Sequence, residues 1–597
     1  MRLMNRKLSL SFLFLLLITF MVEAQTPNDW KTPAEKTDYR TTPTYDETRA
    51  YIERIDAESP LIRLTSFGKT GEGRDLMLVV AAKNAGKMTP ESARKQGKAV
   101  ILIQACIHAG ESDGKDAGLA LLRDIAITKA RQNLLENVVV LFEPIYNADG
   151  HERRSPYNRI NQNGPEEMGW RGNGRNINLN RDYVKADELE TRAWLKLWNQ
   201  WQPDLFIDCH VTNGADYQYN LTYQFEHHET VAPSVRNWLA EAVEKRIVPN
   251  TEKAGNLLAP YLSFRDNRDL TRGIDEFLAT PRFATAYPVL RNRPAILLET
   301  HMLKNYKSRV LATYDFLRFT LEEVNQNKES LLNSGRQADA ETVVAFGKYD
   351  ANRRFPLSLE LTDKSNPFEL KAVASKVEKS DVSGGNWVQF DATKPITLTV
   401  PFYNEARVAA AVAPPVAYIV PPVWAEVIER LELHGLKIER TTKPQIFEVE
   451  MYRLTQPKYA SASFESRVLL TDFKSATFTE KREFPAGSVI VRLNQPNAKA
   501  AVHLLEPIAP DSLLRWGFFN PIFEQKEYGE SYVLEKLARE MLAKDANLKR
   551  EFEARLKTDE NFAKSPRARL NFFFERSPYF DKNIGLYPVG RITNSIK

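Results

Sequence analysis

The segment AVILIQACIHAGE, residues 99–111, decides the fold of this chain. It is an almost unbroken apolar run that ends in a histidine and a glutamate. Further apolar runs occur at residues 138–142, 205–209 and 295–299, and longer stretches with helical periodicity separate them. Short apolar strands that alternate with helices are typical of an α/β fold, here a mostly parallel or mixed central sheet with helices on its faces.

The pattern changes along the chain and predicts several parts. Residues 25–335 form the α/β region, and the turn-rich stretch NSGRQ at 333–337 is expected to be a linker. Short alternating strands predict a β-rich module at 340–412, and strands mixed with helices predict a mixed α/β region at 413–597. Within the last part, 532–556 has the pattern of one charged amphipathic helix.

Residues 1–24 have the pattern of a cleavable signal peptide. Basic residues precede an apolar run at 8–22, and the small residue Ala24 precedes the expected cleavage point. The run is shorter than a membrane-spanning helix requires. We therefore expect a secreted or periplasmic protein with no retained membrane anchor.

Charge and cysteine content exclude other classes of protein. Lysine and arginine number 82 against 77 aspartates and glutamates, and this near balance argues against a nucleic-acid partner. Cys106 and Cys209 are the only cysteines, too few for a disulfide framework, so an ordinary apolar core must hold the chain together. The sequence does not indicate the oligomeric state.

Three side chains near the ends of predicted strands have the chemistry of a zinc site. His108 and Glu111 follow the first strand, and His210 ends the strand at 205–210. Ligands bind at this edge of open α/β sheets, and two histidines with one glutamate form a ligand set for a catalytic zinc with an open position. We expect one zinc ion here, although a structural histidine and a solvated glutamate are the simpler alternatives.

A fourth strand end and a basic loop complete the predicted chemistry. Glu299 follows four apolar residues, where a buried charge without a partner would be costly. A general base that takes a proton from an attacking water would explain it. The loop GWRGNGRNINLNRDY, residues 169–183, places arginines among turn-forming residues, and the planar guanidinium matches a carboxylate or an oxyanion. The simpler alternatives are a solvent-exposed glutamate and a solvated loop.

Taken in order, these residues resemble the zinc carboxypeptidase family, whose best-known member is carboxypeptidase A. The elements that carry the resemblance are Lys69-Thr70-Gly71-Glu72-Gly73-Arg74, His108-x-x-Glu111, Asn147-Ala148-Asp149-Gly150, Trp170-Arg171, Asn180-Arg181, His210 and Glu299. They span about residues 40–330, little more than half of the chain. The resemblance implies that family's fold, a peptide substrate, and zinc held by His108, Glu111 and His210.

The same resemblance implies roles for four further residues. Glu299 would be the general base and acid, and Arg171 would stabilise the oxyanion of the tetrahedral intermediate. Asn180 and Arg181 would bind the terminal carboxylate of the peptide.

The chain departs from the family's pattern at two places. Gly110 stands where digestive members have an arginine between the histidine and the glutamate, so one contact to peptide substrates is missing. A substrate-capping tyrosine is also not obvious, because Phe277 occupies its neighbourhood. Tyr287 is the substitute candidate for substrate binding, with packing as the alternative.

Other candidate residues have simpler interpretations. His227 and His228 are adjacent, so their rings are expected to point different ways in a solvated loop. His301 lies two residues beyond Glu299 and could orient it. Both cysteines are interpreted as small buried apolar residues.

The leading prediction is an exported zinc metallocarboxypeptidase that hydrolyses C-terminal peptide bonds. The missing arginine at Gly110 leaves open a zinc amidase or endopeptidase that acts on γ-D-glutamyl or D-amino bonds of cell-wall peptides. An alternative of another class is a non-catalytic peptide- or glycan-binding protein that uses the second half of the chain.

Overall fold

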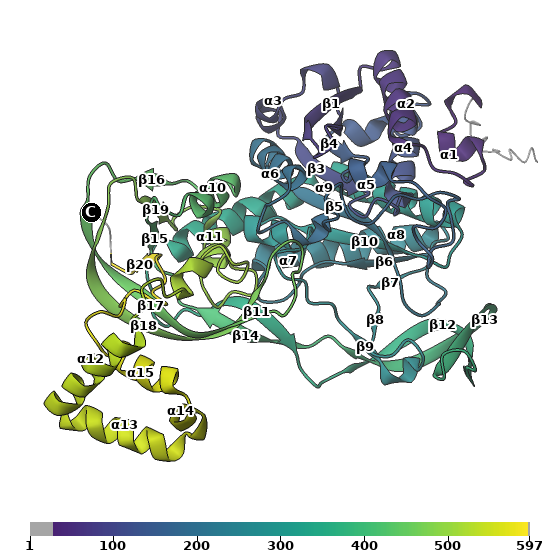
Figure 1. Cartoon of the computed structure of the whole chain (residues 1–597). Coiled ribbons are helices and arrows are strands. Elements are labelled where there is room, and N and C mark those ends of the chain that lie inside the picture. Colours follow the sequence, from purple (N-terminus) through teal and green to yellow (C-terminus); the bar gives the residue numbers. More distant parts are fainter. Residues whose placement is uncertain (1–27, 595–597) are drawn as a thin grey trace, which may run out of the picture.

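The computed structural model describes residues 28–594 of the chain. The predicted signal peptide at 1–24 lies outside these residues. Within the described part, no helix is both long and apolar enough to cross a membrane. Figure 1 shows an α/β body, a β-rich region beneath it, and a group of C-terminal helices that stands apart.

The α/β body is built on an eight-stranded mixed sheet with the order β1-β2-β4-β3-β5-β10-β6-β7. The strands are β1 (Ile62–Lys69), β2 (Asp75–Ala81), β3 (Ala99–Ala105), β4 (Val138–Glu143), β5 (Leu205–Thr212), β6 (Leu221–Gln224), β7 (Leu258–Pro260) and β10 (Ala295–His301). The four apolar runs of the sequence are β4, β3, β5 and β10, which are neighbours and mutually parallel. The predicted fold class is confirmed.

Helices cover both faces of this sheet. They are α2 (Tyr45–Glu58), α4 (Asp113–Ala126), α6 (Leu189–Trp201), α7 (Pro233–Leu239), the π-helix η5 (Ala240–Ile247), α8 (Val248–Lys253) and α9 (Tyr306–Phe346). Alternate strand residues explain the two layers: Ile101 and Ile103 pack with α4 and α9, whereas Val100 and Leu102 pack with the tryptophans of α6. β3, β5 and β10 are therefore buried along their whole length.

The predicted linker at 333–337 is wrong, because α9 runs straight through it. Leu331, Leu332, Ala338 and Phe346 are buried at helical spacing on this stretch. A Cβ at Gly335 would lie 3.2 Å from the guanidinium of Arg293, so the glycine lets Arg293 pack closely against α9. Small residues that suggested a linker thus serve helix packing.

The four strands that follow α9 belong to two further sheets, and one of these sheets includes short strands from the α/β region. β12 (Asn366–Lys379) and β13 (Asn386–Tyr403) form a long hairpin, and β13 pairs with β9 (Ile274–Asp275), which pairs with β8 (Ser263–Phe264). β11 (Phe355–Leu361) pairs with β14 (Ala406–Val412). The long hairpin extends to one side of the molecule in Figure 1.

A separate six-stranded sheet forms the core of the C-terminal part, with the order β16-β19-β15-β20-β17-β18. Its elements are β15 (Ala417–Val420), α10 (Ala425–Leu433), β16 (Glu439–Arg440), β17 (Gln445–Tyr459), β18 (Leu470–Phe484), β19 (Val489–Arg492), α11 (Ala498–Leu505) and β20 (Gly590–Ile592). The outlying helices are α12 (Ser531–Lys544), α13 (Ala546–Thr558), α14 (Glu560–Lys564) and α15 (Pro566–Phe574).

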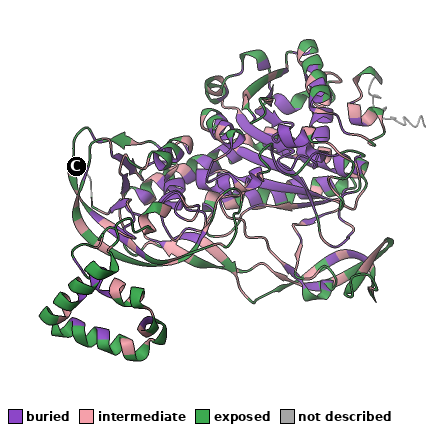
Figure 2. Ribbon diagram, viewed as in Figure 1, coloured by how far each residue is buried: buried purple, intermediate pink, exposed green. Residues whose placement is uncertain are grey.

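The single helix predicted at 532–556 is two helices. Asp545 breaks the run, because its extended backbone ends α12 and its side chain accepts hydrogen bonds from the backbone N–H groups of Asn547 and Leu548. An aspartate in this conformation is a strong helix N-cap. Figure 2 shows that these helices expose most of their surface, in contrast with the buried central sheet.

Buried and half-buried ion pairs hold the second half against the α/β body. The fully buried carboxylate of Asp511 accepts hydrogen bonds from the backbone N–H (2.8 Å) and Nε (2.6 Å) of Arg282. Asp187 accepts two hydrogen bonds of 2.7 Å from Arg467, which lies in the loop between β17 and β18. Such paired contacts fix the two halves in one arrangement.

We predict that Arg282→Met destabilises the chain, because it leaves the carboxylate of Asp511 buried without its cation. The expected loss is about 3 kcal/mol in the free energy of unfolding, measured by urea denaturation. Arg268→Met is the control, since that arginine pairs with Asp266 on the surface and its removal should change little. Equal unfolding midpoints for the Arg282 variant and the wild type would contradict the prediction.

Candidate active site

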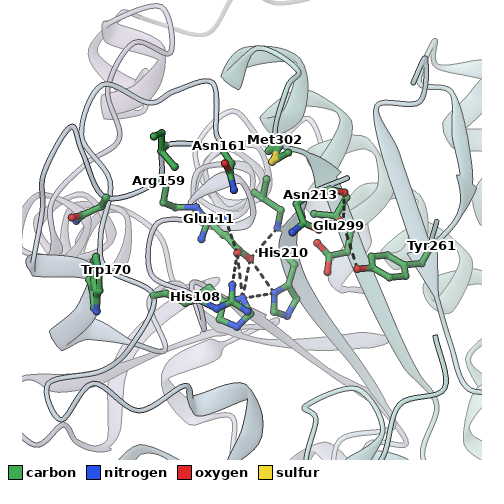
Figure 3. Close-up of a pocket in the computed structure, with 15 residues that line it drawn as sticks. His108, Glu111, Arg159, Asn161, Trp170, His210, Asn213, Tyr261, Glu299 and Met302 are labelled. Carbon is green, nitrogen blue, oxygen red and sulfur yellow. Dashed lines mark hydrogen bonds and ion pairs between the residues drawn. The ribbon is translucent and has the colours of Figure 1, made fainter. Parts of the chain in front are cut away.

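A cavity of about 430 Å³ opens at the carboxyl ends of β3, β5 and β10. Figure 3 shows the side chains that line it, and they come from these strand ends and from the loops beside them. The lining includes His108, Glu111, Arg159, Trp170, Arg171, His210, Thr212, Asn213, Tyr261, Glu299 and Met302. Parallel strands that end at one edge bring these distant residues together.

His108, Glu111 and His210 meet at the floor of this cavity. Oε2 of Glu111 lies 3.2 Å from Nδ1 of His108 and 3.0 Å from Nδ1 of His210, and the two Nδ1 atoms are 3.2 Å apart. All three side chains are buried. Their donor atoms lie close enough together to hold one metal ion.

The partners of the two imidazoles indicate which nitrogen faces the centre. Nε2 of His210 lies 2.7 Å from Oδ2 of Asp208, and Nε2 of His108 lies 3.2 Å from the amide oxygen of Asn178. A proton on each Nε2 satisfies these contacts and leaves both Nδ1 lone pairs facing the carboxylate of Glu111. Three electron-pair donors then converge with no hydrogen between them, which fits a cation such as zinc.

The electrostatics of the site agree with this arrangement. Burial lowers the pKa of His108 to about 3, so its imidazole is neutral. Burial also disfavours the charged form of His210, but Asp208 and Glu111 outweigh it and raise the pKa of His210 well above the usual value. The site therefore favours a positive charge, which a metal ion can supply in place of a proton.

The backbone before His108 is held in an unusual conformation. Cys106 has φ of 60°, in the left-handed region that residues other than glycine rarely adopt. It turns the chain out of β3, and a hydrogen bond of 2.9 Å from the N–H of Glu111 to the carbonyl of His108 closes the next turn. Both cysteines are buried and free, as the sequence indicated. The strain at Cys106 helps to aim His108 and Glu111 at one point.

Glu299 lines the same cavity, next to the candidate metal-binding residues. It sits on β10 directly beside His210 of β5, and its Oε2 is buried without a hydrogen-bond partner among the described residues. Burial raises the pKa of Glu299, against the opposing charge of His210. A carboxylate in this setting is able to accept and return a proton.

Tyr261 is a residue of the site that the sequence analysis missed. It follows β7, lines the cavity and points toward Glu299 in Figure 3, with its hydroxyl 3.4 Å from that of Thr212. Phe277, which drew attention instead, packs against the Tyr261 ring. No local motif marks Tyr261, because it reaches the site only through the pairing of β7 with β6.

The location of Tyr287 does not fit its predicted role. The side chain is fully buried and lies away from the cavity, with its hydroxyl 2.7 Å from Nδ1 of His434. It packs among the aromatic rings around Trp194. His301 packs against the ring of Tyr217. Packing, the alternative interpretation of Tyr287, describes its environment.

The predicted arginines lie at different depths. Arg171 lines the cavity, half exposed, with Nη1 3.5 Å from Oε1 of Glu111. Arg181 lies outside the lining and stacks on Phe283, 4.1 Å from the ring centre. Its neighbour Asn180 is buried, and the side-chain oxygen accepts a hydrogen bond of 2.8 Å from the N–H of Ala284. The structure thus places Arg171, but not Arg181, directly beside the candidate metal-binding residues.

Arg159 supplies a guanidinium where the sequence indicated that one was missing. Its Nη2 lies 2.9 Å from Oε1 of Glu111, and its Cδ would lie only 2.3 Å from a Cβ at Gly110. Gln162 holds Arg159 in place by accepting a 2.7 Å hydrogen bond from Nε and donating one of 3.1 Å to the carbonyl of Gly110. Because Gly110 has no side chain, the Arg159 side chain can pass beside it and reach the cavity.

Comparisons with known proteins agree with the geometry. Residues 48–261 match the family described as zinc carboxypeptidase. Carboxypeptidase 2 of Trichophyton rubrum is 24% identical over 511 residues, which cover 81% of this chain and 87% of that protein. Carboxypeptidase 2 of Trichophyton equinum is 23% identical and covers 80% of this chain and 84% of that protein.

Among solved structures, a metallo-carboxypeptidase from Burkholderia cenocepacia overlaps with 48% of this chain and 70% of its own, with a TM-score of 0.35 and 16% identity. The relatives from Trichophyton align well beyond the first half of the chain. The segment that matches the zinc carboxypeptidase family, residues 48–261, contains His108, Glu111 and His210, the three candidate metal-binding residues.

Proposed function

We propose that this chain is an exported zinc carboxypeptidase that removes residues from the C-terminal ends of peptides. The observation that carries the proposal is the convergence of His108, Glu111 and His210 in one cavity, with Glu299 beside His210. The family match and the names of the relatives support the reaction class. The signal-peptide pattern of residues 1–24 supports export.

His108, Glu111 and His210 would hold one zinc ion. When bound, zinc supplies Lewis-acid chemistry: it polarises the scissile carbonyl and brings the pKa of a water molecule toward neutrality. Glu299 accepts a proton from the attacking water and returns it to the leaving amine. Arg171, at the open side of the cavity, donates hydrogen bonds to the oxygen that becomes negative as the water attacks.

Recognition of the peptide end is assigned to residues farther out. The Arg181 guanidinium stacks on Phe283 and donates a hydrogen bond of 2.7 Å to the carbonyl of Asn180, which leaves its remaining N–H donors for the terminal carboxylate of a peptide. The amide nitrogen of Asn180 could add a donor. Tyr261, in place of Tyr287, is proposed to close over the bound peptide from the Glu299 side of the cavity.

The position of Arg159 bears on the alternative substrate. Cell-wall peptides are an alternative substrate because glycine stands at position 110, where digestive carboxypeptidases have an arginine. Arg159 places a guanidinium beside Gly110 by another route. Arg159 thus supplies the charged donor whose absence at Gly110 suggested a different substrate. Its presence favours ordinary peptides as substrates. A purely binding role would give no reason for the unpaired carboxylate oxygen of Glu299.

We predict that Glu299→Gln lowers kcat by about 10³-fold, because the amide cannot accept the proton. Zinc content should equal that of the wild type, since Glu299 is not among the metal-binding residues. The measurement is hydrolysis of a peptide library with free C-termini, beside the same peptides with amidated ends and a set of muropeptides. Turnover close to that of the wild type would show that another group is the base, and cleavage of muropeptides alone would reject the proposed substrate class.

We predict that Arg159→Ala lowers kcat/KM about 10-fold, because it removes a charged donor from the cavity. Gly110→Ala should have a similar effect with Arg159 intact, since the new Cβ occupies the path of that side chain. Gly86→Ala is the matched control, because a Cβ there has no neighbour within 4 Å. Wild-type kinetics for both single variants would exclude a role for Arg159.

We predict that Asp208→Asn weakens zinc binding about 10- to 100-fold, because the carboxylate orients His210 and fixes its tautomer. Competition with a fluorescent chelator measures the affinity. Asp204→Asn is the control. Asp204 directly precedes β5, the strand that carries Asp208, and its carboxylate accepts a hydrogen bond from the backbone N–H of Val100. Equal zinc affinities of the two variants would show that Asp208 does not act on the metal site.

A further inference from the structure

A second cavity of about 410 Å³ lies beside the first, and Tyr261 lines both. Its walls come from the end of β6, from α7 and η5, and from the segment after β9. His227 and Glu276 are part of this lining. The π-helix η5 contributes Ala240 and Glu244, and π-helical segments are frequently found at functional sites.

His227 and His228 converge on Glu276 in this second cavity region. Nδ1 of His227 lies 3.3 Å from Oε1 of Glu276, and Nε2 of His228 lies 2.9 Å from Oε2. The two rings are 4.1 Å apart and tilted by 36°. The expectation that adjacent histidines point different ways is wrong here, because both rings turn toward one carboxylate.

The local charge favours a cation at this place. Glu276 contributes a carboxylate to the cavity wall. Glu244 adds a further carboxylate to the cavity wall, against one arginine, Arg236. A divalent ion would offset these negative charges.

We propose that His227, His228 and Glu276 form a second metal site, for a divalent transition ion of the zinc type. Two imidazole nitrogens and a carboxylate oxygen suit zinc and its neighbours better than calcium or magnesium, which prefer oxygen ligands alone. His227 is 42% exposed, so solvent can supply the remaining ligand. None of the three residues belongs to the candidate catalytic site.

Binding at this site would join two walls of the cavity. The histidines follow β6, and Glu276 follows β9, which is paired with β13 of the second half. A shared ion therefore ties the segment at 225–228 to the segment that begins at Glu276. The site goes beyond the proposed peptidase function and does not depend on it.

The test is metal stoichiometry of the full-length chain with Zn²⁺ or Co²⁺ alone as the probe. Metal-free protein is titrated, and bound metal is measured by mass spectrometry after desalting and by isothermal calorimetry. We expect two equivalents for the wild type. His228→Ala and Glu276→Gln should each lower the number by one, and His108→Ala should remove the other equivalent. Glu229→Gln, at an exposed neighbouring carboxylate, is the matched control and should leave the number unchanged.

The Co²⁺ absorption spectrum gives a second readout, because the two sites should contribute separate visible bands. His227→Gln, at the more exposed histidine, tests the site where His228→Ala fails to fold. An unchanged stoichiometry and spectrum in His228→Ala or His227→Gln would overturn the proposal, since the three residues would then be joined by hydrogen bonds alone. Loss of peptidase activity in Glu299→Gln has no bearing on this result, so the two proposals stand or fall separately.

Discussion

Two imidazole nitrogens and a carboxylate oxygen, each about 3 Å from the others, form the constraint on which the rest of the structure depends. With each histidine proton on Nε2, these atoms repel one another unless a cation lies between them. The fold supplies the force that holds them there. β3 and β5 are buried on both faces and locked side by side, so neither His108 nor His210 can move away without disturbing the main core.

The second half of the chain also supports this centre. Glu465, in the loop between β17 and β18, accepts a hydrogen bond of 2.8 Å from the backbone N–H of Asn178, whose side chain contacts His108. Glu465 and Ser466 both have positive φ, so the loop bends sharply to present this carboxylate. Arg467 binds Asp187 beside it. The loop that carries the predicted arginines therefore rests on the C-terminal sheet, which fits the extent of the alignment with the Trichophyton relatives.

The sequence could predict the site residues that lie at the ends of strands. His108, His210 and Glu299 end or closely follow continuous apolar runs, so their meeting at one edge of the sheet could be inferred without coordinates. Tyr261 and Arg159 could not, because neither follows a long strand and each reaches the cavity from an irregular segment. The 333–337 stretch was misjudged for a related reason: Ser334 and Gly335 look like linker residues until the packing of α9 on its neighbours is known.

Gly110 and Arg159 show how a site can keep a charge while its sequence motif changes. An arginine at position 110 and an arginine at position 159 would compete for the same space, because a Cβ at 110 already overlaps the Arg159 side chain. The glycine and the distant arginine are thus two halves of one feature, held together by Gln162. A motif comparison records only the loss at 110. The guanidinium itself remains beside Glu111, and the electrostatic character of the cavity follows from that position instead of from the motif.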